Sequence, residues 1–261
     1  VYRDFLGKWL SIFPNDDWWM WIKEAVQQGR EEVAKLLNCS AEDIAFVKNT
    51  TEGIGIIAAG YPWEKGKNIV IPEQEHAACL HSWLPLPGKG IPLKPVKAKD
   101  PQKGLTADDI IDKMDDHTQA VVLSVIQFLD GAFIDMEKLG KTCKSRNVLL
   151  IVDAIQAAGR VDVDVKKWNI DWLACGSHKG LLSMEGGGIV YCHPDLVQKV
   201  IPPYIGMEGT TTRSHILEPD GMQIQFKPGA ARFEGGSVNT LGALCITEAC
   251  QMLNAIGMTN I

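Results

Sequence analysis

The sequence has no long apolar run, and this absence excludes one class of protein directly. No stretch approaches the ~18 consecutive apolar residues that a membrane-spanning helix needs, so we predict no membrane-spanning segment and no membrane partner. Residues 1–21 mix acidic side chains with tryptophans and lack an apolar core before a small-residue cleavage site. They therefore do not predict a signal peptide.

Basic charge is also scarce. The chain has 26 Lys and Arg against 32 Asp and Glu, a net charge of −6, and it has no Lys/Arg block. Proteins that bind nucleic acid carry a basic stripe or patch, so we predict no nucleic-acid partner. The seven cysteines are an odd number and include no CxxC pair. This pattern indicates reduced thiols in a cytoplasmic protein rather than a disulfide framework.

The residues that are present have the balance of a globular α/β protein, with 46% hydrophobic and 22% charged residues in 261. Short apolar runs alternate with helical patterns from residue 44 onward, which predicts a mostly parallel central sheet flanked by helices. The predicted strands cover residues 44–49, 67–73, 120–128, 148–156, 171–177 and 187–192, and the predicted helices cover 50–60, 76–84, 135–147 and 240–258.

Residues 1–40 differ from the rest of the chain. Apolar side chains recur at helical spacing over 16–38, with charges between them. We therefore predict an N-terminal helical segment, 1–40, followed by a larger domain, 41–261. Within this domain residues 201–239 are rich in Gly, Pro and Thr, which predicts loops at the edge of a site.

Polar residues that follow buried strands are the first candidates for a site, because ligands of parallel α/β sheets bind at the carboxyl ends of the strands. Asp153 ends an apolar run, where a buried carboxylate needs a partner. It either caps a following helix or faces a site together with Gln156. Lys179 follows the predicted strand 171–177. It is either a solvated surface charge or an amine with a lowered pKa that forms Schiff bases.

Asn49, Thr50 and Thr51 follow one strand and open a helix. Such residues offer a phosphate site at a helix N-terminus, although simple capping is the alternative. The next residues, Gly53–Ala58, fit the dinucleotide fingerprint G-x-G-x-x-A and favour a nicotinamide-dependent oxidoreductase as another alternative. That fingerprint needs its first glycine in the turn directly after the strand, and here other residues occupy the turn.

His76 follows another strand, and together with Cys79 and His81 it suggests a metal site. Offsets of three and five residues do not put all three side chains on one helix face, and the set has no second cluster of ligands. We therefore predict no metal. His76 is then either a helix-start residue or part of a different site.

These candidates occur in an order that resembles one family. The family is the class V aminotransferases, which are pyridoxal-phosphate enzymes and include cysteine desulfurases and selenocysteine lyases. The resemblance covers residue 44 to the C-terminus and implies the large domain of the type I pyridoxal-phosphate transferase fold. Five segments carry it in the family's order: NTTEGI (49–54), EQEHA (73–77), VDAIQAAGRVDVDV (152–165), GSHKG (176–180) and ARFEGGSVNT (231–240).

The resemblance implies a role for each candidate. Lys179 would hold pyridoxal 5′-phosphate as a Schiff base and then move protons, Asp153 would keep the ring nitrogen protonated, and His76 would stack on the ring. Gln156 would contact the phenolic oxygen. Ser237 would reach the phosphate of a neighbouring subunit, which implies a homodimer with shared sites. The implied cofactor-binding set is Asn49, Thr50, Thr51, His76, Gln127, Asp153, Gln156, Ser177, His178, Lys179 and Ser237, with the threonines and His178 at the phosphate.

Four departures from the family pattern are visible. Gly176 stands where the family usually has a serine, and Ser177 comes one position later. Gln127 stands where desulfurases commonly have an asparagine. Residues 180–188 replace a Gly-Pro turn, and the segment around Ser237 lacks the usual proline.

The largest departure is coverage. Relatives continue into a smaller C-terminal domain that carries the arginine for the substrate carboxylate and, in desulfurases, the attacking cysteine. None of the seven cysteines here occupies that position. The resemblance implies a pyridoxal-phosphate enzyme acting on a small amino acid, most like a cysteine desulfurase or C–S lyase. Gln127 equally allows a transaminase or an amino-acid epimerase, and a degenerate, non-catalytic member stays as a further alternative.

Overall fold

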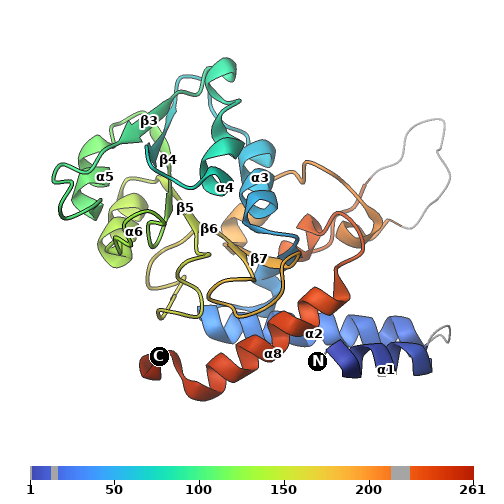
Figure 1. Ribbon diagram of the computed structural model, residues 1–261. Helices are drawn as coiled ribbons and strands as arrows, with labels where there is room; N and C mark the ends of the chain where they lie inside the picture. Colours follow the sequence, from blue (N-terminus) through green and yellow to red (C-terminus); the bar gives the residue numbers. More distant parts are fainter. Residues whose placement is uncertain (1, 13–16, 213–223) are drawn as a thin grey trace, which may run out of the picture.

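A seven-stranded sheet forms the centre of the computed structural model, which describes residues 2–12, 17–212 and 224–261 (Figure 1). The strand order is β1-β7-β6-β5-β4-β2-β3. Only β7 runs against its two neighbours, so the sheet is mixed but mostly parallel, as the sequence predicts. The strands are β1 Ile44–Val47, β2 Asn68–Pro72, β3 Leu93–Val96, β4 Thr118–Ser124, β5 Leu149–Asp153, β6 Trp172–Gly176 and β7 Gly188–Cys192.

Helices cover both faces of the sheet. The α-helices are α1 Tyr2–Ile12, α2 Asp17–Leu37, α3 Thr50–Gly60, α4 Ala77–Leu80, α5 Ala107–Lys113, α6 Met136–Ser145, α7 Pro194–Val197 and α8 Thr240–Ile256. Short 3-10 turns occur at Ala41–Asp43, His81–Trp83, Pro87–Lys89, Met207–Gly209, Ala230–Phe233 and Met258–Asn260. No helix in the described part of the chain is long and apolar enough to cross a membrane.

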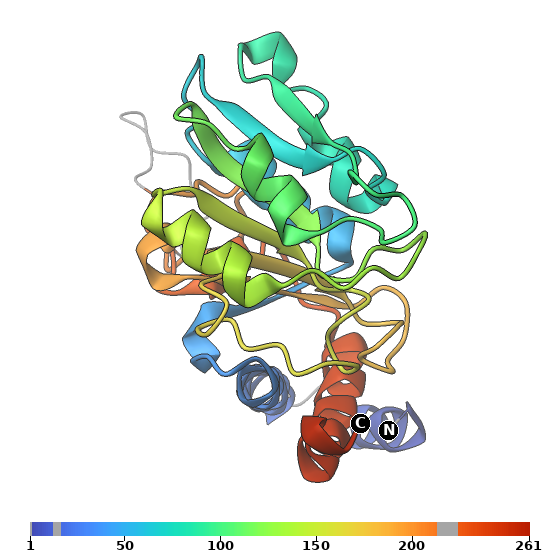
Figure 2. The same cartoon turned by 90° about the vertical axis from the view of Figure 1, so that its left-hand side faces the viewer.

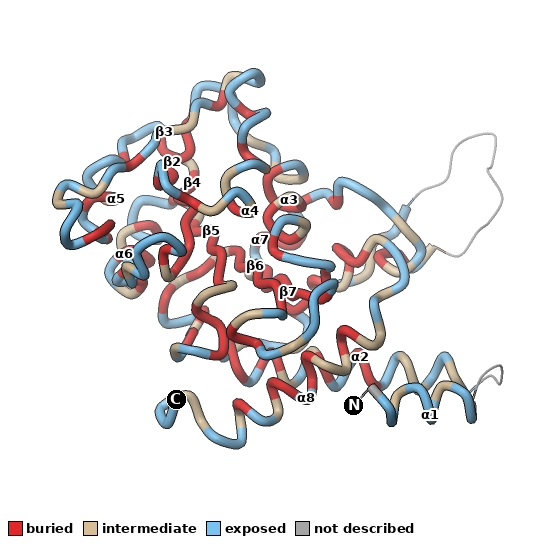
Figure 3. Tube along the Cα trace, viewed as in Figure 1, coloured by how far each residue is buried: buried red, intermediate tan, exposed pale blue. Residues whose placement is uncertain are grey.

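The alternation of side chains along each strand produces two core layers. In β4, Val121 and Leu123 pack with α2, α5, α6 and α8, whereas Ala120 and Val122 pack with α3, α4 and α7. Figure 2 shows α5 and α6 side by side on one face of the sheet, with α2 and α8 next to each other at its end. Both layers exclude water from the strands, which, apart from the edge strand β3, appear almost continuously buried in Figure 3.

Helix α3 lies close against the sheet because of one glycine. A Cβ added at Gly53 would meet the Ala174 Cβ at 2.7 Å and the Val190 Cγ2 at 2.9 Å. Trp172 Nε1 also donates to the Gly53 carbonyl at 3.0 Å. Gly53 therefore serves helix–sheet packing inside α3. The dinucleotide fingerprint needs this glycine in the preceding turn, so the nicotinamide interpretation is wrong.

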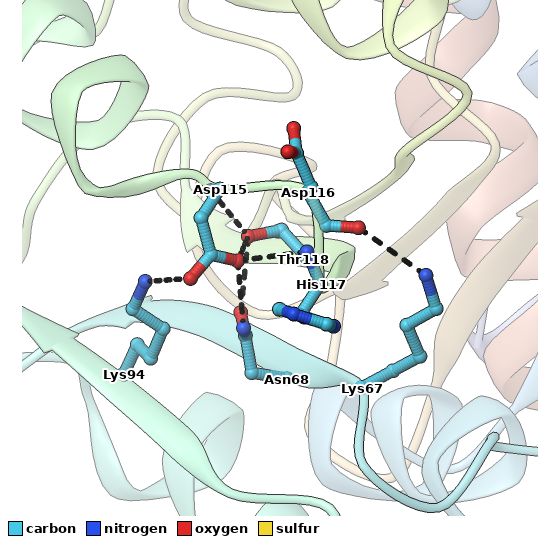
Figure 4. Close-up of polar contacts among 7 residues, drawn as sticks. All are labelled: Lys67, Asn68, Lys94, Asp115, Asp116, His117 and Thr118. Atoms are coloured by element: carbon cyan, nitrogen blue, oxygen red, sulfur yellow. Dashed lines mark hydrogen bonds and ion pairs between the residues drawn. The ribbon is translucent and has the colours of Figure 1, made fainter.

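The N-terminal ends of β2, β3 and β4 are joined by a polar cluster around Asp115 (Figure 4). Its carboxylate accepts hydrogen bonds from Lys94 Nζ at 2.8 Å and from Asn68 Nδ2 at 2.9 Å. Thr118 Oγ1 and the His117 amide also donate to it. These contacts, with that of Lys94 first, hold the pKa of Asp115 well below its usual range. The cluster connects the strands at the edge opposite to the one where their carboxyl ends meet.

A buried ion pair ties the N-terminal helix to the loop before α8. Arg30 in α2 donates to both carboxylate oxygens of Glu234 at 2.7 Å, and the side chains are 14% and 3% exposed. Glu234 Oε1 also accepts from the Phe46 amide in β1 at 2.9 Å. One carboxylate therefore holds three segments that are distant in the sequence.

We expect R30A to destabilise the protein strongly, because it leaves the Glu234 carboxylate buried without its cation. Breaking a buried pair in this way costs about 3–5 kcal/mol in the free energy of unfolding. Urea denaturation measures the change. The matched control is K35A, which removes an exposed partner of Glu32 on the same helix and should leave the free energy nearly unchanged. Equal, small losses for both variants would contradict the structural role of the pair.

Candidate active site

The carboxyl ends of the parallel strands bring the candidate residues to one edge of the sheet. Asp153 ends β5, and Ser124 at the end of β4 lies beside it in register. Lys179 follows β6, the neighbour of β5 on the other side. Glu75 follows β2, two strands away from Asp153. Residues far apart in the chain therefore meet where ligands of α/β sheets bind.

Asp153 is the most buried charged group of this edge, at 1% exposed. Its Oδ1 accepts from the Ile155 amide at 2.9 Å, in a turn and not at the start of a helix. Its Oδ2 is buried and has no hydrogen-bond partner among the described residues. Burial raises the pKa of Asp153 to about 7, and the nearby Glu75 carboxylate acts in the same direction. The Ile155 amide and the Lys179 ammonium group oppose this rise in the pKa.

The unpartnered oxygen of Asp153 tests whether this edge suits the cofactor that the sequence motifs imply. A buried polar atom without a partner destabilises a protein by about 1–3 kcal/mol, so natural structures rarely keep one. A protonated ring nitrogen is a buried donor with a positive charge, which is the partner that a carboxylate of this kind requires. The site therefore fits the pyridine ring of pyridoxal phosphate.

Lys179 is half-buried and close enough to Asp153 for its charge to affect the pKa of that carboxyl. The chain after it turns sharply, since the Leu182 amide donates to the Lys179 carbonyl at 3.0 Å and Leu182 has a φ of +49°. Gly180 allows the turn to touch the segment after β5, because a Cβ there would lie 2.1 Å from the Ala158 carbonyl oxygen. Backbone packing thus brings the segment that carries Lys179 against the segment that follows Asp153.

Ser177 belongs to the cofactor-binding set that the resemblance implies, and in the structure its hydroxyl contacts the backbone of the following loop. Its Oγ lies 2.5 Å from the Met184 carbonyl oxygen and 2.8 Å from that of Gly187, and its amide donates to Gly187 at 3.0 Å. A hydroxyl has one hydrogen, and here it is used to close the loop 177–187. In this conformation Ser177 has no hydrogen left for a phosphate oxygen.

Thr50 is buried at the start of α3, and its Oγ1 accepts from the Gly176 amide at 2.9 Å. The same hydroxyl can also donate its hydrogen to a ligand. A Cβ at Gly176 would lie 3.3 Å from Thr50 Oγ1 and 3.5 Å from His178 Cε1, so the Thr50 and His178 side chains both lie close to Gly176. Asn49 caps α3 by accepting from the Glu52 amide, and Thr51 is exposed in its first turn. This helix N-terminus has the donors for an anion.

His76 starts the short helix α4, and its Nδ1 accepts from the Ala78 amide at 3.1 Å. Its ring packs edge-on against Phe128 with centroids 5.0 Å apart. The metal interpretation has no support, because Nδ1 is engaged with the backbone and Cys79 is fully buried. The described residues contain no group of three potential metal ligands.

Gln156 and Ser237 complete the predicted set. Gln156 Oε1 accepts from Arg160 at 2.7 Å, so its amide nitrogen is the group left to donate. Ser237 is exposed in the loop before α8, which Arg30 and Glu234 hold in place. Its contact with a neighbouring subunit stays a prediction.

Glu75 is a site residue that the sequence motifs did not single out for a role at the sheet edge. It is 6% exposed and accepts from the Ser124 amide and from Gln127 Nε2 at 2.6 and 2.8 Å. Gln127 is therefore held by a buried carboxylate. The signal available in the sequence was an acidic residue three positions beyond a buried strand, directly before His76.

Comparisons with known proteins identify similar sequences and folds. The family model described as aminotransferase class-V matches residues 19–261. A probable cysteine desulfurase of Methanothermobacter thermautotrophicus is 33% identical over 238 residues, which are 90% of this chain and 57% of that protein. The apo structure of a cysteine desulfurase from Thermococcus onnurineus is 28% identical with a TM-score of 0.83, covering 92% of this chain and 59% of that one.

A more distant structure shows the same fold. It is a variant of the protein C-DES with glycine covalently linked to its pyridoxal-phosphate cofactor, 21% identical with a TM-score of 0.87. The alignment covers 98% of this chain and 67% of that one. The chain spans a little under three fifths of the length of the desulfurase relatives described above.

We expect the stability of the cofactor-free protein to fall as the pH rises from about 4 to about 7. The pKa of Asp153 is about 7 in the folded protein and near its ordinary value of 3.8 in the unfolded chain, so the folded state binds more protons between these values. The Asp153 contribution amounts to a loss on the order of 4 kcal/mol across that interval. Urea denaturation at several pH values gives the free energy of unfolding against pH for the wild type and for D153N. The difference between these two curves is the Asp153 contribution.

The matched control for this titration is D195N, which changes a carboxylate that is 87% exposed. Its stability curve should run parallel to that of the wild type. A D153N curve that also runs parallel to the wild type would show that Asp153 titrates as it does in the unfolded chain.

Proposed function

The chain belongs to the class V aminotransferase family, as its motifs predict, and we propose that it binds pyridoxal 5′-phosphate at Lys179 and acts on an amino acid. Family members of this kind are pyridoxal-phosphate enzymes. The reaction we propose is most like that of a cysteine desulfurase or C–S lyase, in keeping with the names of the relatives.

One observation carries the proposal. Among the described residues, one buried oxygen of Asp153 has no partner, and Lys179 is close enough at the same edge of the sheet for its charge to lower the Asp153 pKa. A carboxylate and an amine in this relation suit a ligand with a basic ring nitrogen at one end and a carbonyl group at the other. Thr50 and the N-terminus of α3 supply donors for a phosphate near the same point.

The residues of the chain have distinct tasks in this proposal. Asp153 keeps a proton on the ring nitrogen, and this proton makes the ring more electron-withdrawing. Lys179 would hold the cofactor through Nζ and would move a proton at the Cα of the substrate. His76, whose ring packs edge-on against Phe128, would stack on one face of the cofactor ring. When bound, pyridoxal phosphate stores the electron pair that is released when a bond at Cα breaks.

The thiols of this chain do not supply an activated sulfur nucleophile. Burial raises the pKa of all seven cysteines, and the pKa of Cys39, Cys143 and Cys250 rises to about 12. Reactive cysteines have a lowered pKa and access to solvent. An elimination from the substrate needs no activated protein thiol, which agrees with the raised pKa of these cysteines.

We also propose a homodimer in which Ser237 of one subunit reaches the phosphate bound by the other. The exposure of Ser237, in a loop anchored by the buried Arg30–Glu234 pair, supports this role. A rigid loop is needed for a residue that has to act across an interface.

We expect borohydride to attach the cofactor to Lys179 and to no other lysine. Reduction of the purified chain with pyridoxal phosphate, followed by peptide mapping, locates the modified residue. K179A should lose the adduct, because Lys179 is the amine whose charge affects the Asp153 carboxyl group. The matched control is K141A, an exposed lysine of α6, which should retain the adduct. A covalent adduct in K179A with the same yield as the wild type would rule out the assignment of Lys179.

The products separate the reaction types that the family performs. A desulfurase transfers sulfur from cysteine to an added thiol and leaves alanine, and a C–S lyase eliminates sulfide from cysteine or a persulfide from cystine. A transaminase leaves an aminated cofactor and a keto acid, with the sulfur still bound to carbon. We expect sulfur release by the loaded protein and a loss of at least about 100-fold in K179A, because a positioned proton donor contributes 10²–10⁴-fold. Keto acid without sulfur release would instead favour the transaminase alternative.

A further inference from the structure

Glu75 is a buried carboxylate whose contacts determine what the neighbouring Gln127 can offer to a ligand. Its Oε1 accepts from the Ser124 amide at 2.6 Å and from Gln127 Nε2 at 2.8 Å. Its Oε2 lies 2.6 Å from Ser124 Oγ. Three donors thus converge on one carboxylate that is 6% exposed.

The contacts of Gln127 leave only one orientation for its amide. Nε2 lies 2.8 Å from Glu75 Oε1 and 3.1 Å from the Ser124 carbonyl oxygen. An amide nitrogen has two hydrogens, and a carboxylate and a carbonyl only accept. The opposite orientation would place the amide oxygen against two other oxygens. Both hydrogens are therefore used, and the group that Gln127 can present to a ligand is its carbonyl oxygen.

The position of Gln127 is also fixed at its backbone. Its amide donates to the Ala132 carbonyl at 2.9 Å, and its carbonyl accepts from the Gly131 amide at 3.0 Å, which closes the loop 127–132. The next residue, Phe128, contacts the His76 ring. Ser124, which shares Glu75 with Gln127, lies beside Asp153 in the sheet. Gln127 therefore belongs to the group of residues that surrounds the proposed cofactor site.

We propose that Glu75 is a positioning residue that holds Gln127 as an acceptor, so that the site selects ligands presenting a hydrogen-bond donor to the Gln127 carbonyl. The inference rests on the proposed function. Two groups carry such a donor, namely the ring hydroxyl of pyridoxal phosphate and the amino group of the substrate. An amide free to rotate would satisfy donors and acceptors alike, so Glu75 supplies the selectivity.

The test compares two forms of the cofactor, one with the ring hydroxyl that can donate a hydrogen bond and one without it. Dissociation constants for pyridoxal 5′-phosphate and 3-deoxypyridoxal 5′-phosphate, which lacks the ring hydroxyl, are measured by absorbance titration. The preference for the hydroxylated ring should be about fivefold larger in the wild type than in Q127M, which keeps the side-chain length but has no amide oxygen. Comparing the ratio of the two dissociation constants between variants removes the intrinsic difference in affinity between the two cofactor forms.

Variants at Glu75 separate its positioning role from its charge. E75A should lower the preference to the level of Q127M, because the Gln127 amide can then turn. E75Q is the matched control, since its carbonyl can accept from the Ser124 amide and from Gln127, and its NH2 group can donate to Ser124 Oγ. E75Q should keep the wild-type preference. Should E75A fail to fold, E75D withdraws the carboxylate by one methylene group and is expected to lose the preference instead.

The substrate arm uses L-alanine and propionate, which differ in the amino group, on the protein loaded with pyridoxal phosphate. A changed alanine-to-propionate preference with an unchanged ring preference supports the proposal and identifies the substrate as the donor. The inference is overturned if Q127M leaves both preferences unchanged. It is also overturned if Q127M changes a preference that the folded Glu75 variant leaves unchanged. In both cases the proposed binding of the cofactor still stands. A wild-type chain that binds neither ring overturns the proposed function together with this inference.

Discussion

The account of this protein depends on a carboxylate that is buried without a full set of partners. Asp153 stands at the end of a central strand, and one of its oxygens lacks a hydrogen bond within the described residues. Such a group destabilises the fold unless a donor arrives. The surrounding structure buries this oxygen away from water and leaves it at the carboxyl edge of the sheet, where ligands bind. Strands β4 and β6 flank it, and the backbone of Ile155 takes up its other oxygen.

Backbone packing brings the proposed Schiff-base lysine to the same edge of the sheet as this carboxylate. A Cβ at Gly159 would lie 2.1 Å from the Gly180 carbonyl oxygen, so the turns that follow β5 and β6 touch without side chains between them. Lys179 precedes this contact, and Ser177 closes the loop that returns the chain to β7. The proposed phosphate end is organised in a similar way, since Thr50 Oγ1 accepts a hydrogen bond from the Gly176 amide. Glycines at these close contacts thus set the spacing of the functional side chains.

Much of the architecture could be predicted because the buried strands are uniformly apolar. All six predicted strands are present, together with the amphipathic helix α2. The edge strand β3 was missed because its four residues, Leu-Lys-Pro-Val, include a charge and a proline. Proline and charge are typical of edges and weaken any strand pattern. Helix α5 was missed because it spans only Ala107–Lys113 and has few apolar positions.

The polar contacts of the site were harder to predict than its members. Asp153 and Lys179 stand at strand ends, where position alone makes them candidates. The role of Glu75 depends on donors that lie 49 and 52 residues away in sequence, and no local pattern reveals them. Ser177 likewise uses its hydroxyl on a loop whose shape follows from Gly187 and Leu182. Long-range hydrogen bonds are set by the packing of the strands.

The most direct test of the central claim is the ¹⁵N chemical shift of ring-labelled pyridoxal phosphate bound to this chain. The account predicts the shift of a protonated ring nitrogen well above the pH at which the free cofactor loses that proton, because the buried Asp153 oxygen accepts the N–H. A bound ring whose nitrogen is unprotonated at neutral pH would contradict the account, since Asp153 would then be buried for another reason.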